Sequence, residues 1–173
     1  NIQAPGVINA IDRLVIPMNE EALQHLQPDI LLTFGGMVVS KKIKQFLRQY
    51  TPKQHWHVDT LRHYDTYDCL TDRIFTDAPS FLNQLTAHTQ PISSTYSAWA
   101  NAIMMTRDTQ HKQILQNAIF SDFTVLDYIV RQLPKQSQIQ VSNSAVIRYI
   151  QLLPIDSSIE VFWLSTGCTY CKN

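Results

Sequence analysis

The chain has 173 residues, of which 45% are hydrophobic and 16% are charged, and its formal net charge is zero. This apolar content can form the core of one domain or slightly more, which argues against disorder, and the neutral charge excludes the basic surface that nucleic-acid binding requires. We expect neither a membrane span nor a secretory leader, and the three cysteines (Cys69, Cys168 and Cys171) fit a reducing cytoplasm better than a disulfide framework.

The first half of the chain predicts alternating helices and strands. Short apolar runs, some of them ended by proline or glycine, predict strands at residues 12–17, 29–36, 54–59 and 72–77. Helical spacing of apolar residues predicts helices at residues 19–26, 40–50 and 78–88, with Asn19 and Ser40 as N-caps. This order is typical of a parallel α/β sheet with right-handed crossovers. The strand count predicts an incomplete three-layer α/β/α unit.

The second half predicts helices and then a second α/β unit. Residues 89–95 are polar and contain a proline, as a linker would. Helices are expected at residues 97–116 and 122–132, followed by a turn at residues 133–138. A strand at residues 139–141 leads into another helix that Pro154 ends, and a last strand is expected at residues 159–162.

A phosphate site of the Walker or dinucleotide type is excluded by the scarcity of glycine, since the chain holds only four. Gly35 and Gly36 follow a predicted strand, and Asp59 ends the next one. This pair of features imitates a nucleotide-binding unit, in which a carboxylate at a strand end accepts a ribose hydroxyl. The alternative is a tight strand-to-helix turn in which glycine supplies a positive φ.

Three further patterns have a chemical and a structural interpretation. His55 and His57 alternate on one strand, so they face the same side and either share a metal or pack in the sheet. Cys168 and Cys171 have the spacing of a redox pair or half a zinc site, but without further ligands we interpret the spacing as accidental. The segment 62–68 (RHYDTYD) follows a strand end and is either a ligand loop or a hydrogen-bonded turn.

The segment QVSNSAVIRYI, residues 140–150, is the strongest site candidate. Ser144 is expected to cap the helix, Asn143 to brace the turn, and Arg148 to lie one turn further on the same side as Ser144. Amide groups at a helix start and a guanidinium fork both favour an organic acid or a phosphate. The alternative is an arginine paired with an aspartate or glutamate elsewhere in the fold.

The same segment resembles a known family. QIQVSNSAVIRYIQLL followed by IEVF resembles the start of the diphosphate-binding domain of the 2-succinyl-5-enolpyruvyl-6-hydroxy-3-cyclohexene-1-carboxylate synthases of menaquinone biosynthesis. Upstream, PDILLTFGGMVVSKKIKQFLRQY with HWHVDT resembles the second half of that family's central domain. The resemblance implies residues 1–90 as the second half of the central α/β domain, 91–135 as linker and helices, and 136–162 as the start of the diphosphate-binding domain. Residues 163–173 look foreign to the family.

What the resemblance implies is a thiamine-diphosphate-dependent transferase. The family decarboxylates 2-oxoglutarate and adds the succinyl-semialdehyde carbanion to isochorismate, with Mg or Mn as the metal and as a cytoplasmic homo-oligomer. Asn143, Ser144 and Arg148 would bind substrate carboxylate. The family's pyrimidine-binding domain and metal-binding motif are missing from the sequence. We therefore expect a fragment that is inactive and binds no cofactor by itself. The alternative hypothesis is a noncatalytic nucleotide- or effector-binding α/β module.

Overall fold

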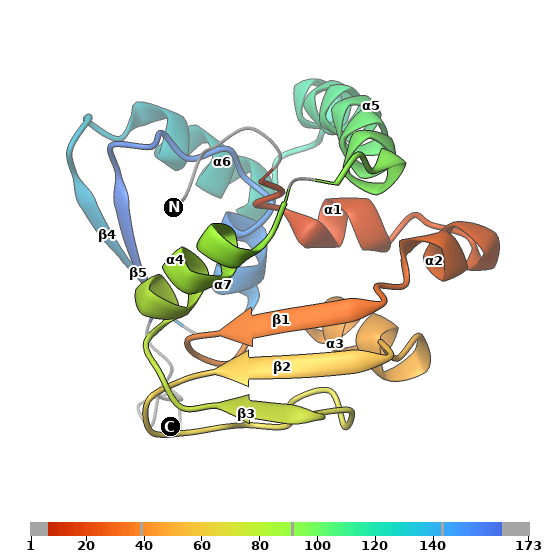
Figure 1. Ribbon diagram of the computed structural model, residues 1–173. Helices are drawn as coiled ribbons and strands as arrows, with labels where there is room; N and C mark the ends of the chain where they lie inside the picture. Colours follow the sequence, from red (N-terminus) through yellow and green to blue (C-terminus); the bar gives the residue numbers. More distant parts are fainter. Residues whose placement is uncertain (1–6, 39, 91, 143, 164–173) are drawn as a thin grey trace, which may run out of the picture. The chain divides into compact units, whose positions relative to one another are not determined.

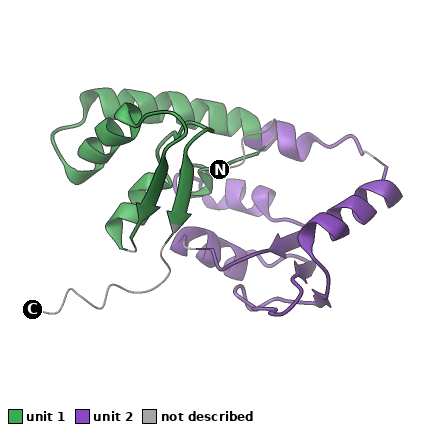
Figure 2. Ribbon diagram, turned by 90° about the vertical axis from the view of Figure 1, so that its left-hand side faces the viewer, with its two compact units in different colours: residues 1–14, 101–173 green, residues 15–100 purple. Residues whose placement is uncertain are grey.

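The computed structural model describes residues 7–38, 40–90, 92–142 and 144–163, with only the backbone of residue 163 included. The chain divides into two compact units (Figure 2). Unit 1 comprises Asn1–Leu14 with Asn101–Asn173, and unit 2 comprises Val15–Ala100.

Unit 2 is built on a three-stranded parallel sheet. The strands are β1 (Ile30–Phe34), β2 (Gln54–Val58) and β3 (Asp72–Ile74), in the order β1-β2-β3. All three arrows point the same way in Figure 1. Helix α3 (Lys41–Gln49) connects β1 to β2, which is the crossover that parallel strands require.

The remaining elements of unit 2 are helical. They are α2 (Glu20–Leu26), α4 (Ala78–His88) and the first residues of α5 (Thr95–Asn117). Tyr96 donates from its hydroxyl to the carbonyl of Leu26 at 2.6 Å, and Trp99 meets His25 edge to face at 4.5 Å between ring centroids. These contacts join the start of α5 to α2.

Capping side chains set the starts of several helices. Asn19 accepts a hydrogen bond from the amide of Ala22 at 2.9 Å, and Ser40 accepts one from Ile43 at 3.1 Å. Such a bond satisfies a backbone donor that has no partner inside the helix. The N-caps predicted at Asn19 and Ser40 are therefore confirmed.

One predicted element was wrong. Residues 12–17 were expected to form a strand, but Ile11–Val15 forms helix α1. Ala10 and Leu14 are both buried, at 4% and 0% exposure. A spacing of four residues places them on one side of a helix and equally on one side of a strand, so this burial pattern fits both elements.

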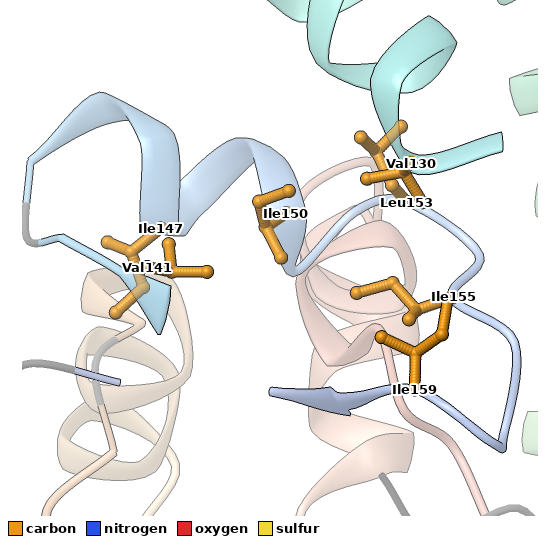
Figure 3. Packing of buried hydrophobic residues seen from close by; sticks show 7 residues of the cluster. All are labelled: Val130, Val141, Ile147, Ile150, Leu153, Ile155 and Ile159. Atoms are coloured by element: carbon orange, nitrogen blue, oxygen red, sulfur yellow. The ribbon is translucent and has the colours of Figure 1, made fainter. Parts of the chain in front are cut away.

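Unit 1 combines most of α1, most of α5 and one further helix with a small parallel β-α-β unit. After α5 come α6 (Asp122–Gln132), β4 (Gln138–Val141), α7 (Ala145–Ile150) and β5 (Glu160–Trp163). Strands β4 and β5 pair in parallel, with Ile139 opposite Val161. Figure 3 shows the buried cluster of this unit, which consists of Val130, Val141, Ile147, Ile150, Leu153, Ile155 and Ile159.

The predicted fold class is confirmed: an incomplete parallel α/β unit is followed by helices and a second short α/β unit. Within the described ranges no helix is both long and apolar enough to cross a membrane. The proposed boundaries at residues 90, 135 and 162 remain predictions.

Candidate functional site

The connection between β4 and α7 carries the predicted anion site. Ser144 precedes α7 and has a φ of 96°, in the left-handed region that serine rarely adopts. Such a conformation costs about 1–3 kcal/mol and is found most often at functional sites. Ser144 and Arg148 are both exposed, whereas Ile147 and Ile150 of the same helix are buried. Helix α7 thus anchors its apolar side and leaves the guanidinium facing solvent.

Arg148 differs from several other arginines of the chain. Arg13, Arg48 and Arg131 each pair with an aspartate at 2.7–3.0 Å. Among the described residues, no carboxylate lies within 4.0 Å of the Arg148 guanidinium. The internal ion pair that was the alternative interpretation is therefore not formed with any described side chain.

The predictions for Asn143 and Ser144 have different outcomes. Asn143 lies outside the described residues. The prediction that Ser144 caps α7 was wrong, because its side chain makes no capping hydrogen bond. A capping residue normally has extended backbone dihedrals, and the φ of 96° and ψ of −141° direct the Ser144 side chain differently. Helix α7 has only six residues, too few for its N-terminal amides to indicate an anion site by themselves. The feature that supports anion binding is the guanidinium of Arg148.

The turn after β1 agrees with the structural interpretation of its glycines. Gly35 has a φ of 77°, which glycine adopts without steric cost. Asp59 accepts hydrogen bonds through Oδ1 from the amides of Leu61, at 2.7 Å, and Arg62, at 2.9 Å. The Arg62 and Leu61 amides lower the pKa of Asp59 because they favour its charged form. This carboxylate braces its own loop, which weakens the case for a ribose contact.

The paired histidines of β2 are joined by a threonine. Thr33 Oγ1 lies 2.8 Å from His55 Nε2 and 2.8 Å from His57 Nδ1. His55 is fully buried and His57 is 5% exposed. Burial lowers the pKa of His55, since it penalises the charged imidazole. The two rings do face one side as predicted, and the hydroxyl between them takes the place that a metal would need.

Sequence reasoning missed Thr33, although a signal existed. A hydroxyl in the middle of an otherwise apolar strand needs a hydrogen-bond partner when that strand is covered. Thr33 lies opposite His57 in the register of the sheet. The strand pairing supplies the partner, and the sequence does not give that pairing directly.

The loop 62–68 is a hydrogen-bonded turn. Asp65 accepts through Oδ1 from the amides of Cys69, at 2.9 Å, and Leu70, at 3.2 Å. Arg48 reaches the loop from α3 and pairs with Asp68 at 3.0 Å. Burial raises the pKa of the Cys69 thiol, so this cysteine is not activated as a nucleophile. Cys168 and Cys171 lie outside the described residues.

A second charged cluster, in unit 1, was not predicted. Arg13 pairs with Asp108 at 2.7 Å, and Arg131 pairs with Asp127 at 2.8 Å. These four side chains and His111 line a cavity of about 460 Å³. Burial, followed by the positive charge of Arg13, lowers the pKa of His111. No pattern could reveal this cluster, because Arg13 and Asp108 are far apart in the sequence.

The described residues do not suit thiamine diphosphate and its metal. They contain no group of three or more His, Cys, Asp or Glu side chains that could hold a metal ion. The glycine turn after β1 has no lysine or arginine among the residues lining the adjacent cavity, so it lacks the positive charge that a diphosphate needs.

Comparison with known proteins identifies the family. The family model described as "Middle domain of thiamine pyrophosphate" matches residues 2–141. The chain belongs to this family of thiamine pyrophosphate enzyme domains. Its parallel α/β architecture agrees with that assignment.

The similar curated proteins carry one name. The 2-succinyl-5-enolpyruvyl-6-hydroxy-3-cyclohexene-1-carboxylate synthase of Flavobacterium johnsoniae is 45% identical over 162 residues, 94% of this chain. Proteins of the same name from Flavobacterium psychrophilum and Bacteroides thetaiotaomicron are 41% identical over 94% and 32% identical over 93% of this chain. The resemblance recognised in the sequence is thus confirmed.

The chain spans only part of these relatives. The matched segment covers 29% of the F. johnsoniae synthase, 30% of the F. psychrophilum synthase and 28% of the B. thetaiotaomicron synthase. The chain therefore corresponds to a thiamine pyrophosphate enzyme domain and spans less than a third of each of these synthases.

Proposed function

We propose that this chain is part of a menaquinone-biosynthesis synthase that decarboxylates 2-oxoglutarate and joins the resulting four-carbon unit to isochorismate. The names of the relatives, which cover 93–94% of this chain, support the assignment. In this proposal the whole protein is a cytoplasmic transferase that works as a homo-oligomer. Thiamine diphosphate and Mg or Mn would be held by parts of the relatives' length that this chain does not span.

Within this proposal, Arg148 binds a carboxylate of 2-oxoglutarate or isochorismate, with Asn143 and Ser144 shaping the turn beside it. The observation that carries the proposal is an exposed guanidinium with no described carboxylate within 4.0 Å. Both substrates are carboxylates, and a guanidinium fork matches the two oxygens of such a group. The left-handed backbone of Ser144 supports a functional turn.

A grafted synthase tests the role of Arg148. The residues of this chain would replace the matching 162-residue segment of the F. johnsoniae synthase, and isochorismate consumption with 2-oxoglutarate would be followed. A charge-assisted hydrogen bond contributes about 1.5–3 kcal/mol. Arg148→Ala should therefore lower kcat/KM for one substrate by about 10- to 150-fold. Arg148→Lys should keep part of the activity as a point charge.

The matched control is Arg48→Ala, which removes an arginine from unit 2 whose partner Asp68 is 72% exposed. We expect this variant to keep the activity of the unmodified graft, because an exposed ion pair contributes at most about 1 kcal/mol. If Arg148→Ala behaves like Arg48→Ala, the carboxylate-binding role is wrong.

The isolated chain is expected to be inactive and to bind no cofactor. Calorimetry with thiamine diphosphate and Mg²⁺ should give no heat of binding with the 173-residue chain. Tight, metal-dependent binding would contradict this expectation. The alternative of a nucleotide-binding module predicts instead that adenine nucleotides, and not dicarboxylates, raise the thermal midpoint.

A further inference from the structure

The carboxyl edge of the sheet in unit 2 contains a cavity whose lining residues all belong to unit 2. Its volume is about 230 Å³. The lining comes from the end of β1, the turn after it, β2 and the loop that follows β2. The lining residues include Thr33, Phe34, Val38, His57, Tyr64 and Tyr67. In open parallel α/β sheets, ligands bind at this edge of the strands.

One buried polar atom in the lining, Nε2 of His57, has no hydrogen-bond partner among the described residues. His57 is 95% buried, since its exposure is 5%. Its Nδ1 is 2.8 Å from the Thr33 hydroxyl, but its Nε2 has no hydrogen-bond partner among the described residues. The neighbouring His55 has both nitrogens occupied, Nε2 by Thr33 at 2.8 Å and Nδ1 by the Cys69 sulfur at 3.7 Å. A buried polar atom is costly unless a protein group, a water or a ligand pairs with it, so His57 Nε2 is a place where a ligand can add a hydrogen bond.

The hydrogen-bond network allows His57 Nε2 to donate or to accept. If the Thr33 hydroxyl donates to His57 Nδ1, then Nε2 carries the proton and is a donor. If Thr33 donates instead to His55 Nε2, then His57 Nδ1 donates to Thr33 and its Nε2 becomes an acceptor. A hydroxyl group or a ring nitrogen on a ligand can satisfy one or both of these states.

The other properties of the cavity select an uncharged aromatic ligand. Phe34, Tyr64 and Tyr67 contribute aromatic surface, and among the described residues the lining includes no lysine, arginine, aspartate or glutamate. A phosphate or carboxylate would lose its hydration there without a compensating charge. A cavity of about 150 Å³ holds benzene, so 230 Å³ accommodates one ring with a substituent or two.

We propose that this cavity is a binding site for a small uncharged aromatic compound whose hydroxyl or ring nitrogen pairs with Nε2 of His57. The aromatic rings of the lining contact the faces and edges of the ligand ring. Phe34 and Tyr64 are 49% and 44% exposed, so aromatic side chains border the side of the cavity that faces solvent. The site adds a ligand to the chain beyond the carboxylates of the proposed function.

Three probes of similar size test the proposal by NMR on the 173-residue chain. Phenol carries the hydroxyl, toluene lacks it, and benzoate replaces it with a charge. Phenol should shift the backbone amides of Gly36, Thr66 and Tyr67, which line the cavity, and the ring signals of His57. We expect phenol to bind at least fivefold more tightly than toluene or benzoate, because only phenol satisfies Nε2 without burying a charge.

Two variants separate binding from folding. Val38→Trp fills the cavity from a residue that is 39% exposed, and it should abolish the phenol shifts without loss of the fold. The matched control Val146→Trp makes the same change at a valine of 40% exposure in unit 1. Its phenol affinity should equal that of the unmodified chain. His57→Phe should make phenol and toluene bind equally.

Several results would overturn the proposal. Equal binding of phenol and toluene to the unmodified chain would remove the role of His57. Tighter binding of benzoate would indicate an anion site. Phenol shifts that persist in Val38→Trp, or that disappear equally in Val146→Trp, would show that the cavity is not where the ring binds.

Discussion

Replacing Thr33 by valine tests the hydrogen-bonded core of unit 2. Valine keeps the shape of threonine but removes the hydroxyl that lies 2.8 Å from both His55 Nε2 and His57 Nδ1. Both rings are at least 95% buried, so their hydrogen bonds to Thr33 lie away from bulk water. Each buried nitrogen left unpaired costs about 1–3 kcal/mol. The added methyl returns less than about 1 kcal/mol of apolar burial.

We therefore expect Thr33→Val to lower the free energy of unfolding by about 2–4 kcal/mol. Urea unfolding measured by circular dichroism and by tryptophan fluorescence would give this difference, since Trp56 lies in β2 between the two histidines. At a slope of about 2 kcal/mol per molar urea, the midpoint should fall by roughly 1–2 M.

Two control variants isolate the hydroxyl. Thr33→Ser keeps it and should lose less than half as much stability as Thr33→Val. Thr86→Val removes an exposed hydroxyl that bonds only to carbonyls of its own helix, Leu82 at 2.9 Å and Asn83 at 3.0 Å, and should cost less than about 0.5 kcal/mol. A Thr33→Val loss no larger than that of Thr86→Val would refute the bridging role.

Three further predictions concern pH, a helix cap and a strained turn. The pKa values of His55 and His111 in the folded chain lie below the ordinary 6.5, so the unfolded chain takes up protons first as the pH falls. The free energy of unfolding should therefore fall as the pH drops below about 6.5. A urea midpoint that stays constant between pH 7 and 5 would contradict this. Asp77→Ala should lower the free energy of unfolding by about 1 kcal/mol, because it removes the hydrogen bond of 2.8 Å that the Ser80 amide donates to Asp77 Oδ1. Asp77→Asn should keep most of this stability. Ser144→Gly should stabilise unit 1 by about 1 kcal/mol, because glycine adopts the φ of 96° without strain, and a loss of stability on thermal melting would show that no strain is stored there.

Local signals predicted most elements of the fold. Asn19 and Ser40 cap helices as expected, and the helices predicted at residues 78–88 and 122–132 have those same bounds. Capping and apolar periodicity act within a few residues, so the sequence displays them directly. The failure at residues 12–17 has the same origin, because a run of so few residues fits both periods.

The candidate sites were predicted less completely. The sequence pointed to Ser144 and Arg148 but could not show whether Arg148 had an internal partner, since that depends on residues brought near it by folding. It presented His55 and His57 as a possible metal pair and gave no sign that Thr33 joins them. The sheet register places Thr33 opposite His57, and only then does the unpaired nitrogen of His57 stand out.

The sequence by itself determined the alternation of helices and strands, the starts of several helices, and the family through an extended match. These properties follow from near-neighbour chemistry and from the order of residues. Tertiary structure alone decided the conformation of Ser144, the exposure of Arg148 and the cavity beside His57. Burial, strand register and cavity shape depend on residues distant in the chain, and only packing brings those residues together.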